Sequence, residues 1–288
     1  MKTGIIRSHR RVEITGKSFR SLLAVFFFFF VTPAWAQFLP EEIGERATWE
    51  AYLKTARIVG SLQITGPEAV TEPWKLTLSD GAVTRFGLWK NPEGRLRGYL
   101  EGWKTEIAAY NLDKMLDLNM VPPTVERLFN EAPGSIQLWI ESEMSLKKYL
   151  QGGVERPPST DRNWNRAFYL QRAFDNLIAN EDRHASNILI TKDWRVILID
   201  HSRCFRTTRR FTTGLLYSAQ SPGGDRSMKE LPRAFVEKIK ALTFDSIKAA
   251  VGGTLTSDQV RATLKRRDLM LADIDRLVQK NGEDRVLY

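Results

Sequence analysis

The sequence predicts an α+β fold with two lobes, a β-rich first lobe and an α-rich second lobe. Two observations support this. Alternating polar and apolar residues dominate the first half, whereas helical periodicity dominates the second half. A stretch rich in Gly and Pro at residues 151–160 separates the two patterns and is typical of a linker. We therefore expect the first lobe at residues 37–150 and the second at residues 151–288.

Turn signals and helix breakers divide the first lobe into elements. Ser79-Asp80-Gly81 marks a hairpin turn, Val121-Pro122-Pro123 ends a helix, and Ala132-Pro133-Gly134 marks a second turn. Glycine-rich loops are expected at residues 60–66 and 91–98. The expected elements are a helix at 41–59, strands at 74–78 and 85–90, a helix at 103–118, and strands at 124–128 and 136–140.

The second lobe is predicted to be helical apart from one short hairpin and one irregular segment. Residues 203–225 lack periodicity and indicate a long functional segment. Ser257 and Asp258 can cap the last helix, and Lys265-Arg266-Arg267 within it suggest a solvated face. The expected elements are a helix at 164–179, strands at 188–190 and 196–199, and helices at 231–242, 244–251 and 257–279.

Residues 1–36 have the layout of a secretory signal peptide. A basic leader precedes an apolar run at residues 22–31, and residues 34–36 follow the A-x-A cleavage pattern. This predicts cleavage before Gln37 and export, so that the protein is periplasmic or secreted. The apolar run is shorter than the roughly 20 residues that span a bilayer, and no integral membrane span is expected after cleavage. An uncleaved anchor is the alternative.

Net charge and cysteine content exclude several classes of protein. Residues 1–36 hold six Lys or Arg and one Glu, so their removal lowers the formal net charge from +9 to +4. This small basic excess suits a protein that handles phosphates, but it does not indicate a nucleic-acid partner. Cys204 is the only cysteine, which excludes an intrachain disulfide. A cysteine nucleophile is disfavoured because only two histidines follow the leader.

The strongest functional signal lies between Asp182 and Asp200. Asp182 follows a predicted helix, Asn187 precedes the first strand of the predicted hairpin, and Asp200 follows the second. Because the start of one strand opposes the end of the next, Asn187 and Asp200 should meet. Phosphoryl transfer needs a group that positions the attacking hydroxyl and oxygen ligands that hold magnesium. A D-R-H sequence alone usually only caps turns, but its combination with the strand pair and the terminal Asp is far more specific.

These residues also resemble a known family. The sequence NEDRHASNIL at residues 180–189, with LIDHS at 198–202, resembles the catalytic and metal-binding loops of atypical kinases of the phosphatidylinositol 3-/4-kinase-like superfamily. Secretory-pathway kinases of the four-jointed and Golgi casein kinase group carry a similar D-R-H element. The resemblance implies a two-lobed protein-kinase-like fold with ATP and Mg²⁺ (or Mn²⁺) as cofactors.

The resemblance assigns a role to each matching residue. Asp182 matches the catalytic aspartate, and His184 matches a histidine that assists proton removal. Asn187 and Asp200 match the metal ligands. The chain departs from the family's D-F-G pattern because His201 and Ser202 follow Asp200. This leaves the metal role intact and makes a D-F-G type of switch doubtful.

The first lobe should supply a lysine–glutamate pair that positions the nucleotide. Lys90 ends a predicted strand and Glu106 lies early in the next helix, as such a pair requires. Lys75, also on a strand, and Glu101, just before the helix, are the rivals. Residues 60–66 are a weak candidate for the phosphate-covering loop, because they lack a G-x-G-x-x-G pattern. The adenine-binding hinge is expected around residues 138–144.

The resulting hypothesis is an exported ATP- and Mg²⁺-dependent kinase that binds a nucleotide and an unknown hydroxyl-bearing acceptor. The acceptor can be a protein, a lipid or a small molecule, and residues 203–228 are expected to distinguish these classes. The alternative is a pseudokinase, a nucleotide-binding scaffold that acts as an interaction module. A metal-dependent hydrolase is the third possibility, although its ligand set would normally contain more histidine.

Overall fold

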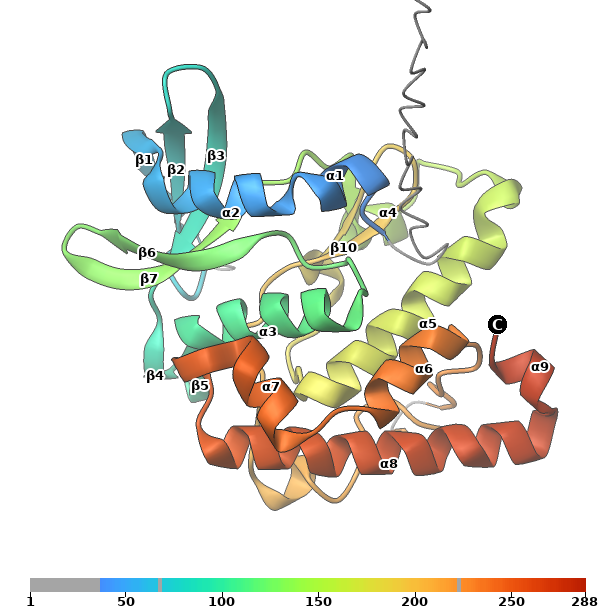
Figure 1. Cartoon of the computed structure of the whole chain (residues 1–288). Coiled ribbons are helices and arrows are strands. Elements are labelled where there is room, and N and C mark those ends of the chain that lie inside the picture. Colours follow the sequence, from blue (N-terminus) through green and yellow to red (C-terminus); the bar gives the residue numbers. More distant parts are fainter. Residues whose placement is uncertain (1–36, 67–68, 222–223) are drawn as a thin grey trace, which may run out of the picture. The chain divides into compact units, whose positions relative to one another are not determined.

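The computed structural model describes residues 37–66, 69–221 and 224–288, and it has the predicted α+β architecture (Figure 1). The predicted signal peptide lies outside these residues. An antiparallel five-stranded sheet fills most of the first half of the chain, and helices dominate the second. In sheet order its strands are β1 (Arg57–Gln63), β2 (Trp74–Ser79), β3 (Thr84–Lys90), β7 (Ala132–Leu138) and β6 (Thr124–Phe129).

The helix α2 (Arg46–Thr55) packs on this sheet, and Figure 1 shows it lying across the strands. The short helix α1 (Pro40–Gly44) precedes it and contacts it. The α2 residues Tyr52 and Leu53 are buried in the apolar core of the sheet, and the Tyr52 hydroxyl donates to the Leu78 carbonyl at 2.7 Å. The helix therefore covers one face of the sheet and completes the first core.

The prediction for residues 41–66 was partly wrong. The predicted helix ends at Thr55, and the expected loop at residues 60–66 is largely strand β1, in which Gly60 pairs with Thr77. β1 is an edge strand, and a register shift between Ile58 and Gly60 interrupts it. This bulge and the exposure of the strand remove the regular alternation by which strands are recognised.

Two turn predictions also need correction. The β6–β7 turn lies at Asn130 and Glu131, which both have positive φ (49° and 62°), so β7 starts earlier than predicted and includes residues 132–134. Positive φ at both positions is the geometry that joins tight hairpins. The expected loop at 91–98 instead holds most of a hairpin, β4 (Glu93–Leu96) and β5 (Tyr99–Gly102).

The predicted short hairpin is present in the second half. β9 (Ile188–Ile190) and β10 (Val196–Leu198) pair antiparallel, with Leu198 opposite Ile188. β8 (Met144–Ser145) joins them on the other side of β9, and α4 (Leu146–Leu150) follows it directly. The segment between β7 and β8 therefore connects the two sheets.

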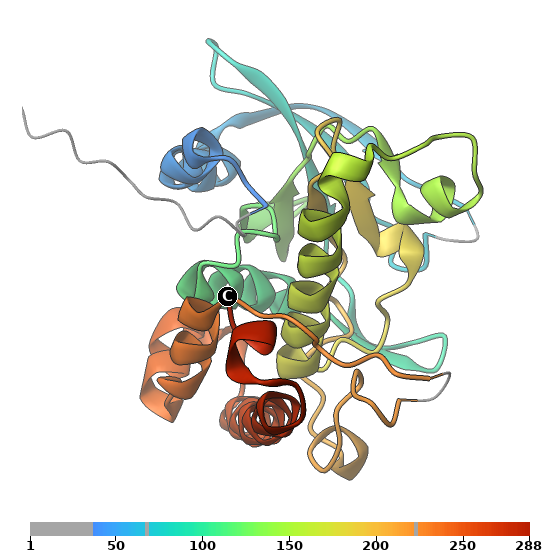
Figure 2. The same ribbon diagram turned by 90° about the vertical axis from the view of Figure 1, so that its right-hand side faces the viewer.

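The helices form the second core. The helix α3 (Trp103–Leu116) packs on β6 and β7, while most of its buried apolar residues belong to the helical core, so it lies at the junction of the two halves. Figures 1 and 2 show that α8 crosses near the C-terminal end of α5, which it contacts, on the side of the molecule away from β1–β3. The helices are α3 (Trp103–Leu116), α5 (Asp161–Ile178), α6 (Arg233–Lys240), α7 (Phe244–Val251), α8 (Ser257–Asn281) and α9 (Glu283–Val286).

Two details of α8 differ from the prediction. Thr256 is its N-cap, in a capping box with Gln259, so Ser257 and Asp258 lie inside the helix. Arg266 does not lie on a solvated face, because it is 1% exposed. It donates to the carbonyl oxygens of Leu177 at 2.7 Å and Arg206 at 2.8 Å. This side chain connects α8 to the end of α5 and to the irregular segment.

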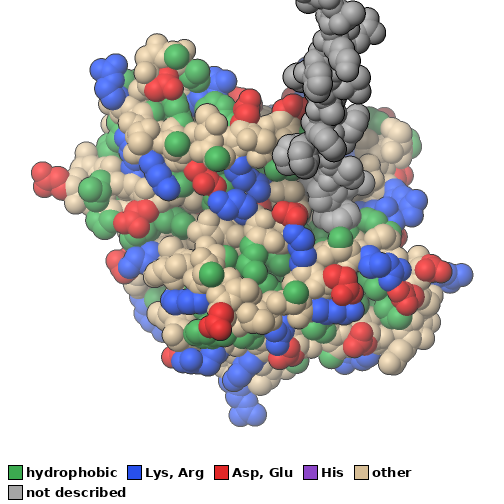
Figure 3. Space-filling model, viewed as in Figure 1, with side chains coloured by type: hydrophobic (Ala, Val, Ile, Leu, Met, Phe, Trp, Pro, Cys, Tyr) green, Lys and Arg blue, Asp and Glu red, His purple; other side chains and the backbone are tan. Residues whose placement is uncertain are grey.

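Lys and Arg side chains lie among Asp and Glu side chains on the face shown in Figure 3. In the described part of the chain, no helix has both the length and the apolar character that a membrane crossing requires.

Candidate functional site

Lys90 lies at the centre of a buried ion-pair cluster. Its Nζ donates to Oε1 of Glu106 at 2.9 Å and to Oδ1 of Asp200 at 2.8 Å. Lys90 ends β3 and pairs with Ser135 of β7, which places it inside the sheet, while Glu106 lies in the first turn of α3. The fold thus brings the predicted lysine–glutamate pair together and adds Asp200 from the second half of the chain.

The two rivals of this pair have other partners. The Lys75 ammonium lies over the rings of Phe86 and Trp139, at 4.1 and 4.2 Å from their centroids. Glu101 accepts a hydrogen bond from Nε of Arg203 at 2.5 Å. Of the four candidate residues, only Lys90 and Glu106 therefore contact each other as a lysine–glutamate pair.

The charges of the cluster stabilise one another. Burial alone would neutralise Lys90, but Asp200 and Glu106 raise its pKa above the usual value. Burial also disfavours the Asp200 carboxylate, but the Lys90 ammonium holds the pKa of Asp200 below its usual range. Burial likewise opposes ionisation of Glu106, and Lys90 again keeps its pKa low. The lysine and both carboxylates are therefore charged at neutral pH.

His201, which follows Asp200, links this cluster to Arg183. Its backbone N–H donates to Oε2 of Glu106 at 2.9 Å, and its Nε2 lies 2.8 Å from Nη2 of Arg183. Burial lowers the His201 pKa. Since a guanidinium can only donate, the neutral imidazole accepts at Nε2 and carries its proton on Nδ1. Arg183 in turn forms a buried ion pair with Asp175 of α5 at 2.9 Å.

The loop after α5 presents Asp182 and Asn187. The Asp182 N–H donates to Oδ1 of Asn180 at 3.1 Å, an Asx-type turn, and Asn187 Nδ2 donates to the Asp182 carbonyl at 3.2 Å. Burial raises the pKa of the Asp182 carboxyl against the opposing effect of Arg203. His184 is largely exposed, with Nε2 4.0 Å from Asp182 Oδ2. These hydrogen bonds hold the backbone of the loop in place. The Asp182 carboxyl group and the His184 imidazole project outward from it.

Asn187 and Asp200 approach one another as the hairpin predicts. The Ile199 N–H donates to the Asn187 carbonyl at 3.2 Å, which extends the β9–β10 ladder by one step. Asp200 follows in the left-handed conformation with φ 60°. This conformation is uncommon outside glycine, although Asp tolerates it better than most residues. The chain turns sharply here, and Asp200 and Asn187 line the same cavity.

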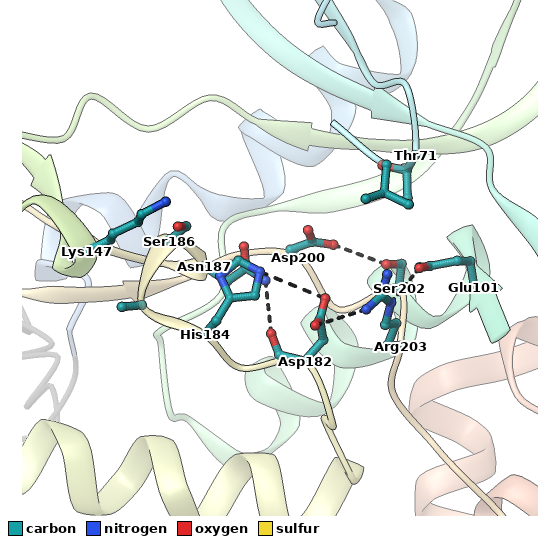
Figure 4. Close-up of a pocket in the computed structure, with 12 residues that line it drawn as sticks. Thr71, Glu101, Lys147, Asp182, His184, Ser186, Asn187, Asp200, Ser202 and Arg203 are labelled. Atoms are coloured by element: carbon teal, nitrogen blue, oxygen red, sulfur yellow. Dashed lines mark hydrogen bonds and ion pairs between the residues drawn. The ribbon is translucent and has the colours of Figure 1, made fainter. Parts of the chain in front are cut away.

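All four predicted residues of the second half line one cavity of about 490 Å³ (Figure 4). Lys90 and Glu106 do not line it; Lys90 contacts Asp200, and Glu106 contacts Lys90. Val70 and Thr71, from the loop after β1, cover the cavity, whereas the predicted residues Gly60 and Gly66 do not line it. The lining residues are Val70, Thr71, Glu101, Lys147, Asp182, His184, Ala185, Ser186, Asn187, Asp200, Ser202 and Arg203.

The oxygen atoms in this cavity suit a hard divalent cation. Asp200 Oδ1 accepts from Lys90 and Ser202, while no described residue donates to Asp200 Oδ2 or to the Asn187 side-chain oxygen. Mg²⁺ and Mn²⁺ bind such oxygens and complete their shells with phosphate and water. Across the described ranges, no three His, Cys, Asp or Glu side chains cluster as a ready-made metal site. The chemistry that fits is therefore a metal held jointly with a bound phosphate.

Two functional candidates escaped the sequence analysis. Arg203 contacts Asp182 Oδ1 through Nη1 at 3.0 Å, and Ser202 donates to Asp200 Oδ1 at 3.1 Å. Arg203 begins the segment without periodicity and Ser202 directly precedes it, so no pattern marked them individually. Their only signal was proximity in sequence to Asp200.

The comparisons with known proteins support the fold. No protein-family model matches the chain, and no curated protein matches it. Solved structures do match. The structure of hydra Fam20 with sugar has a TM-score of 0.60 and 16% identity over 85% of this chain and 92% of that one. A Golgi casein kinase structure matches with a TM-score of 0.59 and 15% identity over 85% of this chain and 77% of that one.

A Golgi casein kinase structure with Mn/ADP bound matches equally well. Its TM-score is 0.60, with 15% identity over 85% of this chain and 78% of that one. The chain is therefore similar in fold to these secretory-pathway kinases along most of its length, with a β-rich and an α-rich half arranged as in a two-lobed kinase.

Proposed function

We propose that the protein is an ATP- and divalent-metal-dependent kinase that transfers a phosphoryl group to a hydroxyl acceptor outside the cytoplasm. One observation carries the proposal. Lys90 contacts both Glu106 and Asp200, while Asp182 and Asn187 line the same cavity as Asp200. A phosphotransferase needs these groups within reach of one nucleotide triphosphate. The kinase-like fold, shared with a neighbour solved with Mn/ADP, supports it.

Each residue has a role in the proposed reaction. Lys90, oriented by Glu106, binds the nucleotide phosphates, and Asn187 and Asp200 hold Mg²⁺ or Mn²⁺. A metal held there would supply positive charge against the negative charge of the phosphates. Asp182 orients the acceptor hydroxyl and accepts its proton as the new oxygen–phosphorus bond forms and the bond to ADP breaks. His184 assists the proton's removal.

The proposal also includes the predicted export, the division into lobes and the predicted superfamily of the protein. Residues 1–36 would direct export to a periplasm or to the cell exterior, and the lobes would divide near residue 150. Kinship with the phosphatidylinositol 3-/4-kinase-like superfamily rests on the motif at residues 180–189. The similarity in fold to secretory-pathway kinases supports an exported enzyme.

The acceptor has a candidate binding region beside the cavity. A second cavity, of about 890 Å³, shares Glu101 and Ser202 with the first and is lined by residues 204–208, by the β4–β5 hairpin and by the start of α8. Its position next to Asp182 suits an acceptor that approaches from this side. A protein, a lipid or a small molecule such as a sugar can carry the hydroxyl. One structural neighbour was solved with sugar.

The alternative function is a pseudokinase that binds nucleotide without transferring phosphate. The Asp200-His201-Ser202 sequence favours it, since it replaces the D-F-G element. The presence of Asp182, Asn187 and Asp200 in one cavity favours the active enzyme instead.

Labelled ATP distinguishes the two functions. Residues 37–288 are incubated with γ-labelled ATP and Mg²⁺ or Mn²⁺, together with acidic proteins, lipids and sugars in separate reactions. An active kinase transfers label to one acceptor class, and Asp200→Ala abolishes both the transfer and metal-dependent nucleotide binding. Nucleotide binding without transfer to any class identifies the pseudokinase. Unchanged binding and transfer by Asp200→Ala would show that the metal assignment is wrong.

A further inference from the structure

Arg203 places a guanidinium in the wall of the proposed phosphate cavity. Its Nη1 lies 3.0 Å from Asp182 Oδ1, and its Nε donates to Glu101 Oε1 at 2.5 Å. Figure 4 shows the side chain between these two carboxylates, on the side of Asp182 away from His184. Its side chain is 12% exposed, so most of it is removed from water while its end still reaches the cavity.

The β4–β5 hairpin holds this guanidinium in place. Glu101, on β5, is 3% exposed and therefore a rigid partner, and the Tyr99 ring lies under the guanidinium at 4.2 Å. The backbones are joined as well, since the Gly102 N–H donates to the Ser202 carbonyl at 2.9 Å and Arg206 donates to the Leu100 carbonyl at 2.6 Å. Arg203 is thus held by contacts on three sides. Ordering a long charged side chain in this way costs conformational entropy, which suggests a functional role for Arg203.

The donors of Arg203 are only partly used. Nε and Nη1 are engaged by Glu101 and Asp182, and within residues 37–66, 69–221 and 224–288 Nη2 has no hydrogen-bond partner. Planar guanidinium groups bind phosphate through two parallel N–H donors. Nη1 and Nη2 form such an edge, and Nη1 already points at the carboxylate that would hold the acceptor hydroxyl.

The lining of the cavity carries more carboxyl groups than Lys and Arg side chains, of which it has Lys147 and Arg203. Three lining side chains, Glu101, Asp182 and Asp200, are carboxyl groups. Lys90 contacts Glu106 and Asp200 and does not line the cavity. A phosphoryl group in transfer spreads negative charge over its three outer oxygens, and an arginine aimed at them stabilises that charge. Among the residues lining the cavity, Arg203 is the one arginine.

We propose that Arg203 contacts the phosphoryl group during transfer and stabilises its charge, with Glu101 and Tyr99 as positioning residues. The inference rests on the proposed kinase function. In this arrangement the guanidinium bridges the transferring group and Asp182, and so aligns the attacking hydroxyl with phosphorus. The competing explanation is a restraint in which Arg203 only neutralises Asp182.

Binding of a transition-state mimic separates these explanations without an acceptor. Calorimetry measures the affinity of residues 37–288 for ADP·Mg²⁺ with and without aluminium fluoride, which mimics the transferring phosphoryl group. We expect fluoride to tighten binding by wild type. In Arg203→Ala the fluoride-dependent increase in affinity should be at least tenfold smaller than in wild type, since one charge-assisted hydrogen bond contributes about that factor to affinity. The affinity of this variant for ADP·Mg²⁺ alone should stay within about twofold of wild type. An equal fluoride gain in Arg203→Ala would overturn the inference.

Two further variants keep the test informative if Arg203→Ala misfolds. Arg203→Ala leaves Glu101 buried without its partner. Arg203→Lys keeps the charge but removes the planar fork, and we expect it to recover only part of the fluoride gain. Glu101→Gln retains a hydrogen-bond acceptor, and we expect it to reduce the gain less than Arg203→Ala does. Full recovery of the gain by Arg203→Lys would contradict a bidentate contact.

Arg166 provides a matched control. It pairs with Glu230 at 3.0 Å and its guanidinium lies over the Tyr288 ring at 3.4 Å, so it repeats the surroundings of Arg203 in a different cavity. Arg166→Ala should keep the fluoride gain of wild type. With an acceptor in hand, Arg203→Ala should lower kcat by about 100-fold or more with little change in the KM for ATP. A rise in kcat would instead identify a restraint on Asp182.

The outcomes also separate this inference from the function on which it rests. Absence of ADP·Mg²⁺ binding by wild type would refute the proposed kinase together with the role of Arg203. Normal ADP·Mg²⁺ binding with a fluoride gain that does not depend on Arg203 would refute the role of Arg203 alone.

Discussion

Nζ of Lys90 lies 2.8 Å from Oδ1 of Asp200, although 110 positions separate the two residues in the chain. Lys90 belongs to the sheet and Asp200 follows the small hairpin of the second half, so this contact joins the two halves at the proposed active site. Glu106 at the start of α3 completes it. The site therefore depends on the relative placement of three elements.

Replacement of Lys90 tests the nucleotide-binding role of this contact. Lys90→Met should weaken ATP·Mg²⁺ binding by about ten- to 100-fold, because it removes a charge-assisted contact to phosphate worth about 1.5–3 kcal/mol. Lys114→Met is the control, since Lys114 also pairs with a glutamate, Glu50 at 2.7 Å, but lies outside the cavity. Calorimetry below the melting temperature of both variants measures the effect. Equal affinities in the two variants would remove Lys90 from the nucleotide site.

Arg266 should be important for stability. Arg266→Ala leaves the carbonyls of Leu177 and Arg206 without their buried donor, and we expect the free energy of unfolding to fall by about 3–5 kcal/mol. The neighbouring Lys265 is exposed, and Lys265→Ala should change it by less than about 0.5 kcal/mol. Urea unfolding measures both values. A small loss in Arg266→Ala would mean that water replaces the guanidinium.

Asp113 should make stability fall as pH rises. Burial raises its pKa to about 7, from an ordinary value of 3.8, against the opposing effect of Arg46, whose Nη2 lies 3.7 Å away. Between these two values the unfolded chain has released the proton and the folded chain still holds it. The folded state therefore loses stability with increasing pH, by on the order of 1–4 kcal/mol.

The Asp113→Asn variant isolates this effect. An asparagine oxygen still accepts the backbone N–H groups of Met120 and Val121, which now donate to Asp113 at 2.9 and 3.1 Å, but it does not titrate. Relative to this variant, wild type should lose stability as pH rises from 4 to 8, as followed by urea unfolding at each pH. Parallel pH profiles would show that Asp113 ionises normally in the folded state.

Local patterns were enough to predict the parts of the site that are close in sequence. Asn187 and Asp200 meet because a short hairpin joins them, and the position of Lys90 at the end of a strand was visible from alternation. Glu106 was preferred over Glu101 by its place in the helix, and the geometry agrees. Each of these predictions depends only on the alternation of polar and apolar residues within one or two strands or helices.

The features that escaped prediction depend on distant partners. Glu101 and Arg203 are brought together by a hairpin that the sequence suggested to be a loop, since its four-residue strands are too short for a clear alternation. Arg266 was assigned to a solvated face because helical periodicity does not reveal which neighbour covers a given residue. A buried arginine becomes stable only when distant carbonyl groups accept its protons.

Phosphate transfer by Asp182→Asn is the most direct test of the central claim. The variant keeps the size of the side chain but cannot accept the proton of the acceptor hydroxyl. With γ-labelled ATP, Mg²⁺ and the acceptor that wild type labels, we expect transfer to fall by at least about 100-fold while ADP·Mg²⁺ affinity stays within about twofold of wild type. Transfer at the wild-type rate, or absence of metal-dependent nucleotide binding by wild type, would contradict the assignment of this cavity as a kinase active site.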